Sequence, residues 1–396
     1  MAGIGAILAF GRSRNAGTFD PAGLTAPYGA LGDLLAGPAA RWDSVWFIAI
    51  AQEGYVAAHH AAFFPLYPLL MRGAAFGSSH SGVLLAAGLA VSLVAMLVAL
   101  VLLRRLAALE LGDAAARTTV TLVAFFPMAF FLSAVYSESL YLALSVGAFW
   151  AARNERWALA GTVGALAATT RSAGLLLLVP LAILYLYGPR GERAARRHRL
   201  GPYKMRPRYR PSWNMLWLGL IPLGLAAFMA ALALSGQDAF APFRAQDVWM
   251  RELAGPFVAV WDGAVAAFDG ARQLLSGSRF PVYFTPAGGD PFAAAGHNLV
   301  LFASLLLAIP MLVAALRRLP AAYGAYALCA LALPLSFPVA AQPLMSLPRF
   351  LVVLFPLHMG LAAWASERGW SRWVVGLSAL GLAAFAAQFA AWVWVA

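Results

Sequence analysis

Long apolar runs recur along the whole of this chain, and they constrain its fold more than any other feature. Most runs are long enough, or nearly so, to cross about 30 Å of hydrocarbon as a helix. Backbone groups in lipid must be hydrogen-bonded internally, so spanning segments are helices unless a closed barrel forms. Barrel strands alternate apolar and polar residues, whereas these runs are solidly apolar and rich in Ala, Leu and Gly. The sequence therefore predicts an all-α polytopic membrane protein.

The apolar runs predict a bundle of about ten to eleven transmembrane helices. An apolar stretch from Gly3 to Phe10 is too short to span, and Arg12 and Arg14 follow it, which is the wrong order for a signal peptide. This stretch is either the tail of a first transmembrane helix that begins outside this chain, or an interfacial or disordered start. The predicted spans are residues 81–103, 118–135, 139–152, 157–170, 173–188, 214–235, 294–316, 321–340, 350–366 and 373–394.

The net charge of +12 comes almost entirely from arginine, because Lys204 is the only lysine. The arginines gather in short loops between apolar runs, a pattern typical of cytoplasmic loops and not of nucleic-acid binding. Residues 189–210 carry the largest cluster, which either sets topology or binds anionic lipid head groups. Cys329 is the only cysteine, so no disulfide forms within the chain. The other clusters are Arg104, Arg105 and Arg117; Arg153 and Arg156; Arg317 and Arg318; and Arg368 and Arg372.

Four regions follow from this topology. Residues 1–80 form an N-terminal fragment and a first external loop, and residues 81–235 form a transmembrane core with a basic cytoplasmic loop at 189–212. Residues 236–293 form a second large external loop, and residues 294–396 the C-terminal transmembrane helices. We expect an interfacial helix in the first loop. In the second loop, Trp249, Phe257, Trp261 and Phe268 have spacings that predict an amphipathic helix at the membrane surface.

The segment from Arg41 to Tyr55 contains the first candidate for chemistry. It is predicted to be helical from Asp43 to Gly54, which can cap its C-terminus. Asp43 lies at the N-terminus, where a carboxylate can accept backbone N–H bonds and act only as a helix cap. The alternative is a general base that deprotonates an acceptor hydroxyl at the membrane face.

Residues 62–68 contain two prolines three apart among aromatics, which predicts a turn where the chain enters the membrane. His59 and His60 precede this turn. They are interpreted as solvated loop histidines, because no His-x-x-x-His spacing accompanies them; the alternative is a metal site with Asp43 or Glu53.

Ionisable residues also interrupt or begin apolar runs on the proposed external side. Glu138, Arg171 and Arg349 are at membrane depth, where a charged side chain suggests a functional site. Either arginine can pair with Glu138, and either can hold a phosphate in bidentate fashion; Glu138 can also simply end a turn at the interface. The sequence has no Gly-rich phosphate loop, His-Glu-x-x-His or nucleophile elbow, so soluble nucleotide-sugar chemistry is not supported.

These segments, in this order, resemble the PIG-V family, the GPI second-mannose transferases and their bacterial relatives, which belong to the GT-C glycosyltransferases. The resemblance covers about residues 29–360, and Gln246, Trp249 and Arg251 match it more loosely. Departures include Trp46, where eukaryotic members often have His, and Ala173, where they have Asn. The matching motifs are Arg41-Trp42-Asp43, Ile50-Ala51-Gln52-Glu53-Gly54-Tyr55, Phe63-Phe64-Pro65-Leu66-Tyr67-Pro68, Phe126-Pro127, Tyr136-Ser137-Glu138-Ser139-Leu140, Thr170-Arg171-Ser172-Ala173-Gly174 and Pro348-Arg349-Phe350.

The resemblance implies a GT-C-like bundle that transfers mannose, or a similar hexose, from a polyprenyl-phosphate donor at the extracytoplasmic face of the cell membrane. The implied transfer is inverting, with Asp43 as general base and Arg171 or Arg349 stabilising the leaving phosphate. The implied transfer is metal-optional: the resemblance establishes no cofactor and leaves open whether a divalent cation, Mg²⁺ or Mn²⁺, takes part. The partners are the donor, a lipid or glycan acceptor and membrane lipids, with no nucleic acid. Residues implied to bind substrate or support the site are Arg41, Trp42, Glu53, Tyr55, Phe64, Tyr67, Tyr136, Glu138, Gln246 and Trp249.

Two other functions remain open at this level. The first is a lipid or amphiphile transporter or flippase, in which Glu138, Arg171 and Arg349 line an intramembrane path. The second is a non-catalytic scaffold. The transferase is favoured because its acidic residue lies in an external loop, and because the internal repeats found in many transporters are not detected.

Overall fold

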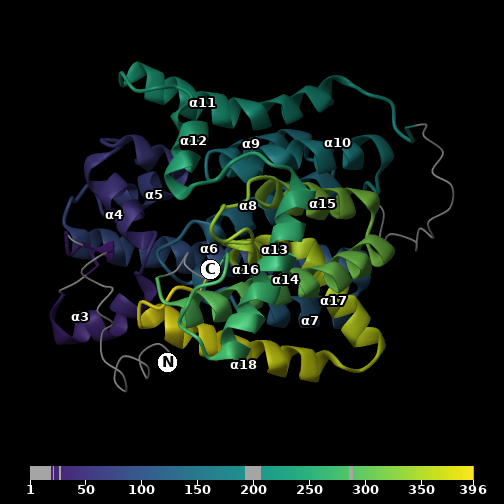
Figure 1. Cartoon of the computed structure of the whole chain (residues 1–396). Coiled ribbons are helices and arrows are strands. Elements are labelled where there is room, and N and C mark those ends of the chain that lie inside the picture. Colours follow the sequence, from purple (N-terminus) through teal and green to yellow (C-terminus); the bar gives the residue numbers. More distant parts are fainter. Residues whose placement is uncertain (1–18, 21, 26–27, 192–206, 285–288, 396) are drawn as a thin grey trace.

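The computed structural model describes residues 19–20, 22–25, 28–191, 207–284 and 289–395. Within these ranges the regular structure is helical, and only isolated β-bridges join Val339 to Arg251 and Gln342. The chain is an all-α polytopic membrane protein (Figure 1). The apolar stretch from Gly3 to Phe10 lies outside the described residues.

Helices long and apolar enough to cross a membrane account for four or five of the predicted spans in the described part of the chain. The fifth is a pair of helices, α16 (Leu347–Val353) and α17 (Phe355–Glu367), which is long and apolar enough only when the two are taken as one span, with a bend of 75° between them. The number of membrane crossings remains a prediction. The four long helices are α6 (Ser81–Leu111), η5 with α11 (Trp213–Leu234), α14 (Pro291–Arg318) and α18 (Ser371–Ala390).

The other predicted spans are shorter helices, as the polar interruptions in the sequence had suggested. With 12 residues, α9 (Trp157–Ala168) is about 18 Å long, well below the roughly 30 Å of hydrocarbon in a bilayer. Short helices whose ends meet inside the bundle leave room for a cavity. The remaining short helices are α7 (Asp113–Ala124), η3 (Ala129–Leu132), α8 (Glu138–Arg153), η4 (Ser172–Leu177), α10 (Leu178–Tyr187) and α15 (Ala321–Ser336).

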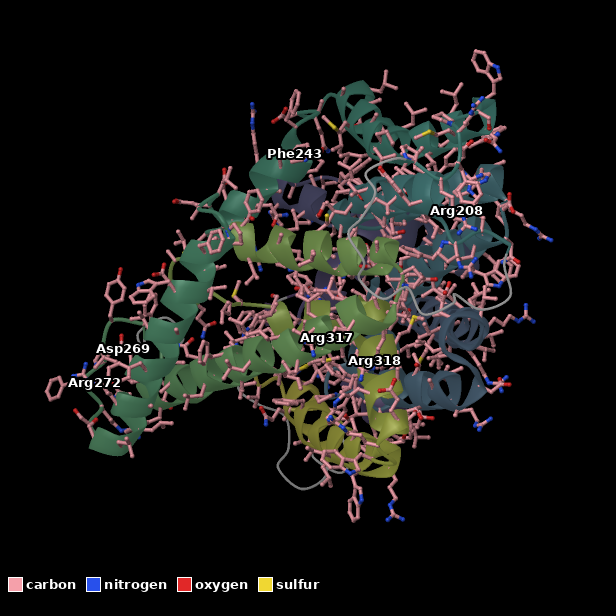
Figure 2. The ribbon with its side chains drawn as sticks, turned by 90° about the vertical axis from the view of Figure 1, so that its right-hand side faces the viewer. Arg208, Phe243, Asp269, Arg272, Arg317 and Arg318 are labelled. Atoms are coloured by element: carbon pink, nitrogen blue, oxygen red, sulfur yellow. The ribbon has the colours of Figure 1, made fainter. Side chains whose placement is uncertain are left out.

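The arginine-rich turns meet at one end of the bundle. Arg153, at the end of α8, forms an ion pair with Glu110 at the end of α6, and Glu110 also accepts a hydrogen bond of 2.9 Å from Tyr323. Arg318 binds Glu367 across 2.7 Å, which joins the ends of α14 and α17. Figure 2 looks onto this end of the molecule, where Arg208, Arg317 and Arg318 are labelled.

The two predicted external loops contain most of the non-spanning helices. In the first loop, α4 begins directly after Asp43 and ends where the N–H of Gly54, at φ +80°, bonds to the carbonyl of Ile50 at 2.9 Å, as predicted. These helices lie at the opposite end of Figure 1 from the end viewed in Figure 2. They are α3 (Gly29–Leu35), η1 (Gly37–Ala39), α4 (Ser44–Glu53), η2 (Ala58–Ala62) and α5 (Leu66–Ala74).

The second loop forms α12 (Ala241–Arg244), η6 (Ala245–Trp249) and α13 (Pro256–Ser276). The amphipathic helix predicted there is α13, but it contains only Phe257, Trp261 and Phe268; Trp249 belongs to the preceding η6. Glycine and alanine residues of α13 pack against α14, where Gly270 lies so close to the carbonyl of Ala295 that an added Cβ would come within 2.7 Å of its oxygen.

Candidate active site

A cavity of about 350 Å³ lies where the two external loops meet the short helices. Segments distant in sequence form its wall, namely α4, the start of α8, the turn before η4, α12 with η6, the end of α15 and the turn into α16. Its polar lining residues are Asp43, Ser137, Tyr141, Thr170, Arg171, Ser172, Gln246, Arg251, Ser346 and Arg349.

Asp43 lines this cavity, and its carboxylate is not used to cap α4. The side chain makes no capping hydrogen bond, so the interpretation as a simple helix cap is wrong. Its Oδ2 instead accepts a charge-assisted hydrogen bond from Nη1 of Arg349. No described residue donates a hydrogen bond to Oδ1, and the side chain is 18% exposed. The carboxylate is therefore held at one oxygen, and the other has no hydrogen bond from the described protein.

Tyr136 fixes the backbone on which Asp43 stands. Its hydroxyl donates to the carbonyl of Arg41 at 2.9 Å and accepts from the backbone N–H of Asp43 at 3.1 Å. The guanidinium of Arg349 lies over the Tyr136 ring, 4.6 Å from its centre, where a cation–π contact is favourable. One buried tyrosine thus positions both members of the Asp43–Arg349 ion pair.

Glu138 joins the two arginines that the sequence analysis had singled out. Its Oε1 accepts hydrogen bonds from Nε of Arg349 and, at 2.5 Å, from Nη1 of Arg171. The side chain is only 1% exposed, and none of the described residues donates a hydrogen bond to its buried second oxygen. Asp43, Arg349, Glu138 and Arg171 therefore form one continuous row of alternating charges.

Arg251 is the third arginine of the cavity, and within the described part of the chain its side chain donates hydrogen bonds only to neutral groups. Its Nη1 and Nη2 donate to the carbonyls of Phe337 at 3.2 Å and Met345 at 3.3 Å. No carboxylate of a described residue lies within ion-pair distance of it. Burial lowers the pKa of Arg251 to about 10, so the group remains charged at pH 7.

The charges around the cavity do not cancel. Three guanidinium groups face two carboxylates, those of Asp43 and Glu138, which leaves one formal positive charge. A partly desolvated positive charge is stabilised by an anion that can accept its hydrogen bonds. The cavity is therefore suited to a ligand with a single negative charge.

The other predicted site residues do not all line the cavity. Phe64 and Gln246 line the cavity. Arg41, Trp42, Tyr67 and Tyr136 are buried beneath it, where Tyr67 bonds to Ser92 at 2.7 Å. Tyr55 and Glu53 lie outside the lining; Tyr55 donates to the carbonyl of Phe63 at 2.7 Å, and Glu53 is exposed at the end of α4. Trp249 is located only by its backbone, in η6.

The histidines differ from their interpretation as solvated loop residues. His60 is buried, with its ring packed 5.9 Å from that of Trp46 and its Nδ1 3.3 Å from the carbonyl of Gly54. No group of three or more His, Cys, Asp or Glu side chains in the described ranges is arranged to hold a metal ion. The two carboxylates at the cavity, Asp43 and Glu138, bind guanidinium groups, an arrangement that does not fit a resident divalent cation.

Sequence reasoning gave no role to two of the lining residues, Arg251 and Trp394. Arg251 was noted only beside Gln246 and Trp249, since an arginine in a charged external loop gives no signal of where its side chain lies. Trp394 ends an apolar run and reads as an ordinary interfacial aromatic.

Known proteins are similar to this chain in the segment that contains Asp43 and Glu138. Residues 26–186 match the family described as Mannosyltransferase (PIG-V). Over this segment the chain is similar to the PIG-V mannosyltransferases. It is 36% identical over 174 residues to GPI alpha-1,6-mannosyltransferase 2 of Rattus norvegicus, a match that covers 41% of this chain and 35% of that protein. The Mus musculus protein of the same name is 34% identical over 164 residues, covering 39% of this chain and 33% of the relative.

The PIG-V match does not reach every part of the cavity. The chain spans about a third of the length of the curated relatives it matches. No solved structure matches the chain. Asp43, Glu138 and Arg171 lie inside the matched segment, whereas Arg251, Arg349 and Trp394 lie outside it.

Proposed function

We propose that this protein is a membrane mannosyltransferase whose donor is a polyprenyl-phosphate mannose. The PIG-V match supports the reaction class, and the cavity supports the donor class. A sugar linked to a lipid through one phosphate is a phosphodiester with a single negative charge, which equals the uncompensated charge of the cavity. A nucleoside-diphosphate sugar carries at least two negative charges and would need further cations. This charge balance is the observation that carries the proposal.

The phosphate is proposed to bind next to Arg251, with Arg349 and Arg171 completing its surroundings. Arg251 is free to bind an anion without breaking an ion pair, since its present hydrogen-bond partners are carbonyls. Arg349 and Arg171 are already held by Glu138, which fixes their positions before the donor arrives. Preorganised positive charges of this kind stabilise negative charge that develops on a leaving phosphate.

Asp43 is proposed to act as general base. The acceptor hydroxyl attacks the anomeric carbon, the bond from that carbon to the phosphate oxygen breaks, and the hydroxyl proton passes to Asp43. The bonding pair leaves with the phosphate, which the arginines stabilise. The attack inverts the anomeric centre, because attacking and leaving oxygens are on opposite faces. Oδ1 of Asp43 is the oxygen available for this proton, since Oδ2 is bound to Arg349.

The site is proposed to face the extracytoplasmic side of the cell membrane. The arginine-rich turns lie at the other end of the bundle, and clustered arginines mark cytoplasmic loops. The acceptor is a lipid-linked or cell-envelope glycan presented at the same face.

The donor class can be tested with the purified protein in proteoliposomes containing a lipid extract of the source cells. Polyprenyl-phosphate [³H]mannose should label an acceptor lipid, whereas GDP-[³H]mannose should not. Label transferred from GDP-mannose alone would overturn the donor assignment. Movement of the mannosyl lipid across the vesicle membrane, with no mannose transferred to an acceptor, would favour the transporter function instead.

A further inference from the structure

The segment that follows α18, Ala391–Val395, packs against the Arg41-Trp42-Asp43 motif. Nε of Arg41 donates to the carbonyl of Ala390 at 3.1 Å. The guanidinium of Arg41 lies 5.1 Å from the centre of the Trp392 ring, which is almost completely buried. The end of the last helix is thus attached to the residues immediately before the candidate base.

Two tryptophans of this segment enclose Trp42. The Trp392 and Trp394 rings contact that of Trp42 edge to face, with centres 5.6 and 4.9 Å away. Trp42 has φ +55°, a left-handed backbone conformation that a bulky side chain rarely adopts unless its surroundings hold it. The enclosure therefore helps to hold the turn that presents Asp43.

Trp392 and Trp394 have different exposure, which separates their functions. Trp392 is 2% exposed and does not line the cavity. Trp394 is only partly buried and lines the cavity together with Asp43, Arg349 and Arg251. Trp394 also borders a second, small pocket whose lining includes Asp43 and Arg349. Its ring is therefore a wall of the cavity beside the reacting groups.

We propose that Trp394 is a sugar-binding residue, against which the mannosyl ring of the donor packs, and that Trp392 is a positioning residue for Asp43. This inference rests on the proposed function. A pyranose ring has an apolar face of C–H groups that pairs with an aromatic ring, while its hydroxyls need polar partners. With the phosphate beside Arg251 and Arg349, the attached sugar lies within the same cavity, between the arginines, Asp43 and Trp394.

The test compares the binding of polyprenyl-phosphate mannose with that of the same polyprenyl phosphate without sugar. Trp394→Ala should weaken binding of the mannosyl lipid about fivefold, the size expected for one lost aromatic contact. Binding of the sugar-free lipid should not change. Trp394→Phe keeps a ring and should retain most of the affinity. The control is Trp373→Ala in the preceding helix α18, at a side chain that is 68% exposed and does not line the cavity.

Three outcomes decide the assignment. Selective loss of mannosyl-lipid binding in Trp394→Ala supports it, even if the wild type transfers no mannose and the proposed function fails. If Trp394→Ala weakens the binding of both lipids equally, or of neither lipid, the proposed sugar contact is overturned. For Trp392→Phe we expect a lower kcat with an unchanged KM for the donor; a raised KM with unchanged kcat would contradict a positioning role.

Discussion

At the scale of single residues, the three cavity arginines are chemically distinct. Arg349 is held by Asp43 and Glu138, and Arg171 by Glu138, so removing either arginine also takes an ion-pair partner from a carboxylate. Arg251 bonds to carbonyls, so its removal takes away a charge and leaves the ion pairs intact. Arg251 is therefore the residue at which phosphate binding can be changed with the least disturbance.

We expect Arg251→Gln to raise the KM for the donor by about tenfold to a hundredfold, the value of a charge-assisted hydrogen bond of roughly 1.5–3 kcal/mol. Arg251→Lys should recover part of the loss. Donor titrations of mannosyl transfer measure this, with Arg244→Gln as the control, because Arg244 is 72% exposed and pairs with Asp238. An unchanged KM in Arg251→Gln would remove this residue from the phosphate site.

His60 makes the stability of the first external loop depend on pH. Burial lowers the pKa of His60, so the unfolded chain binds this proton more tightly than the folded chain does. The stability that the neutral ring contributes is present above about pH 6.5 and is lost as the pH falls through the lower folded pKa. The temperature at the midpoint of thermal unfolding in detergent should therefore decrease as the pH is lowered from 6.5. The decrease should be less steep in His60→Gln. Equal slopes in the two proteins would show that another group is responsible.

At the scale of elements, a buried ion pair far from the cavity holds three helix ends together. Glu110 of α6 binds Arg153 of α8 and Tyr323 of α15, and Arg153 also donates to the carbonyl of Pro189 at 3.1 Å. Both charged side chains are fully buried. Breaking one partner leaves a buried charge uncompensated, whereas replacing both can be neutral.

Glu110→Gln or Arg153→Met should therefore lower the free energy of unfolding by about 3–5 kcal/mol, and Glu110→Leu combined with Arg153→Met should recover most of it. Denaturation in detergent measures the stability, and donor KM should stay at the wild-type value. A double variant less stable than either single one would contradict this account of the helix ends.

The outward face of α13 is the second element with a testable role. Phe257, Trp261 and Phe268 are 88, 71 and 64% exposed, while the buried residues of α13 are Ala and Gly together with Asp269 and Gln273. Figure 2 shows α13 at the edge of the molecule, with Asp269 and Arg272 labelled. An exposed aromatic face of this kind is typical of a helix in the membrane interface.

Cys329→Ser removes the single native cysteine, so that a fluorophore can be attached at Phe268→Cys. In proteoliposomes, brominated lipids should quench this fluorophore. The same label at Asp113→Cys, whose side chain is 73% exposed at the arginine-rich end, should be quenched mainly by aqueous iodide. A label at position 268 that iodide quenches and brominated lipid does not would contradict the interfacial placement.

At the scale of the whole molecule, the sequence predicted the features that depend on local pattern. Solid apolar runs located the helices, Gly54 located the end of α4, and charges at membrane depth located Glu138, Arg171 and Arg349. Features that depend on distant contacts were not predicted. Arg41 bonds to a carbonyl 349 positions away, and Arg251 to one 94 positions away. No local pattern encodes such contacts, which is why the roles proposed for Arg251 and Trp394 needed the structure.

The central claim is that Asp43 accepts the acceptor proton in a cavity that binds a polyprenyl-phosphate mannose. The most direct measurement is mannosyl transfer by Asp43→Asn in proteoliposomes, with donor binding and thermal midpoint measured on the same preparation. Asp113→Asn, at the opposite end of the bundle, is the control. We predict that kcat falls by at least about a hundredfold, as for the loss of a general base, while Asp43→Asn still binds the donor. Wild-type transfer by Asp43→Asn would contradict the account.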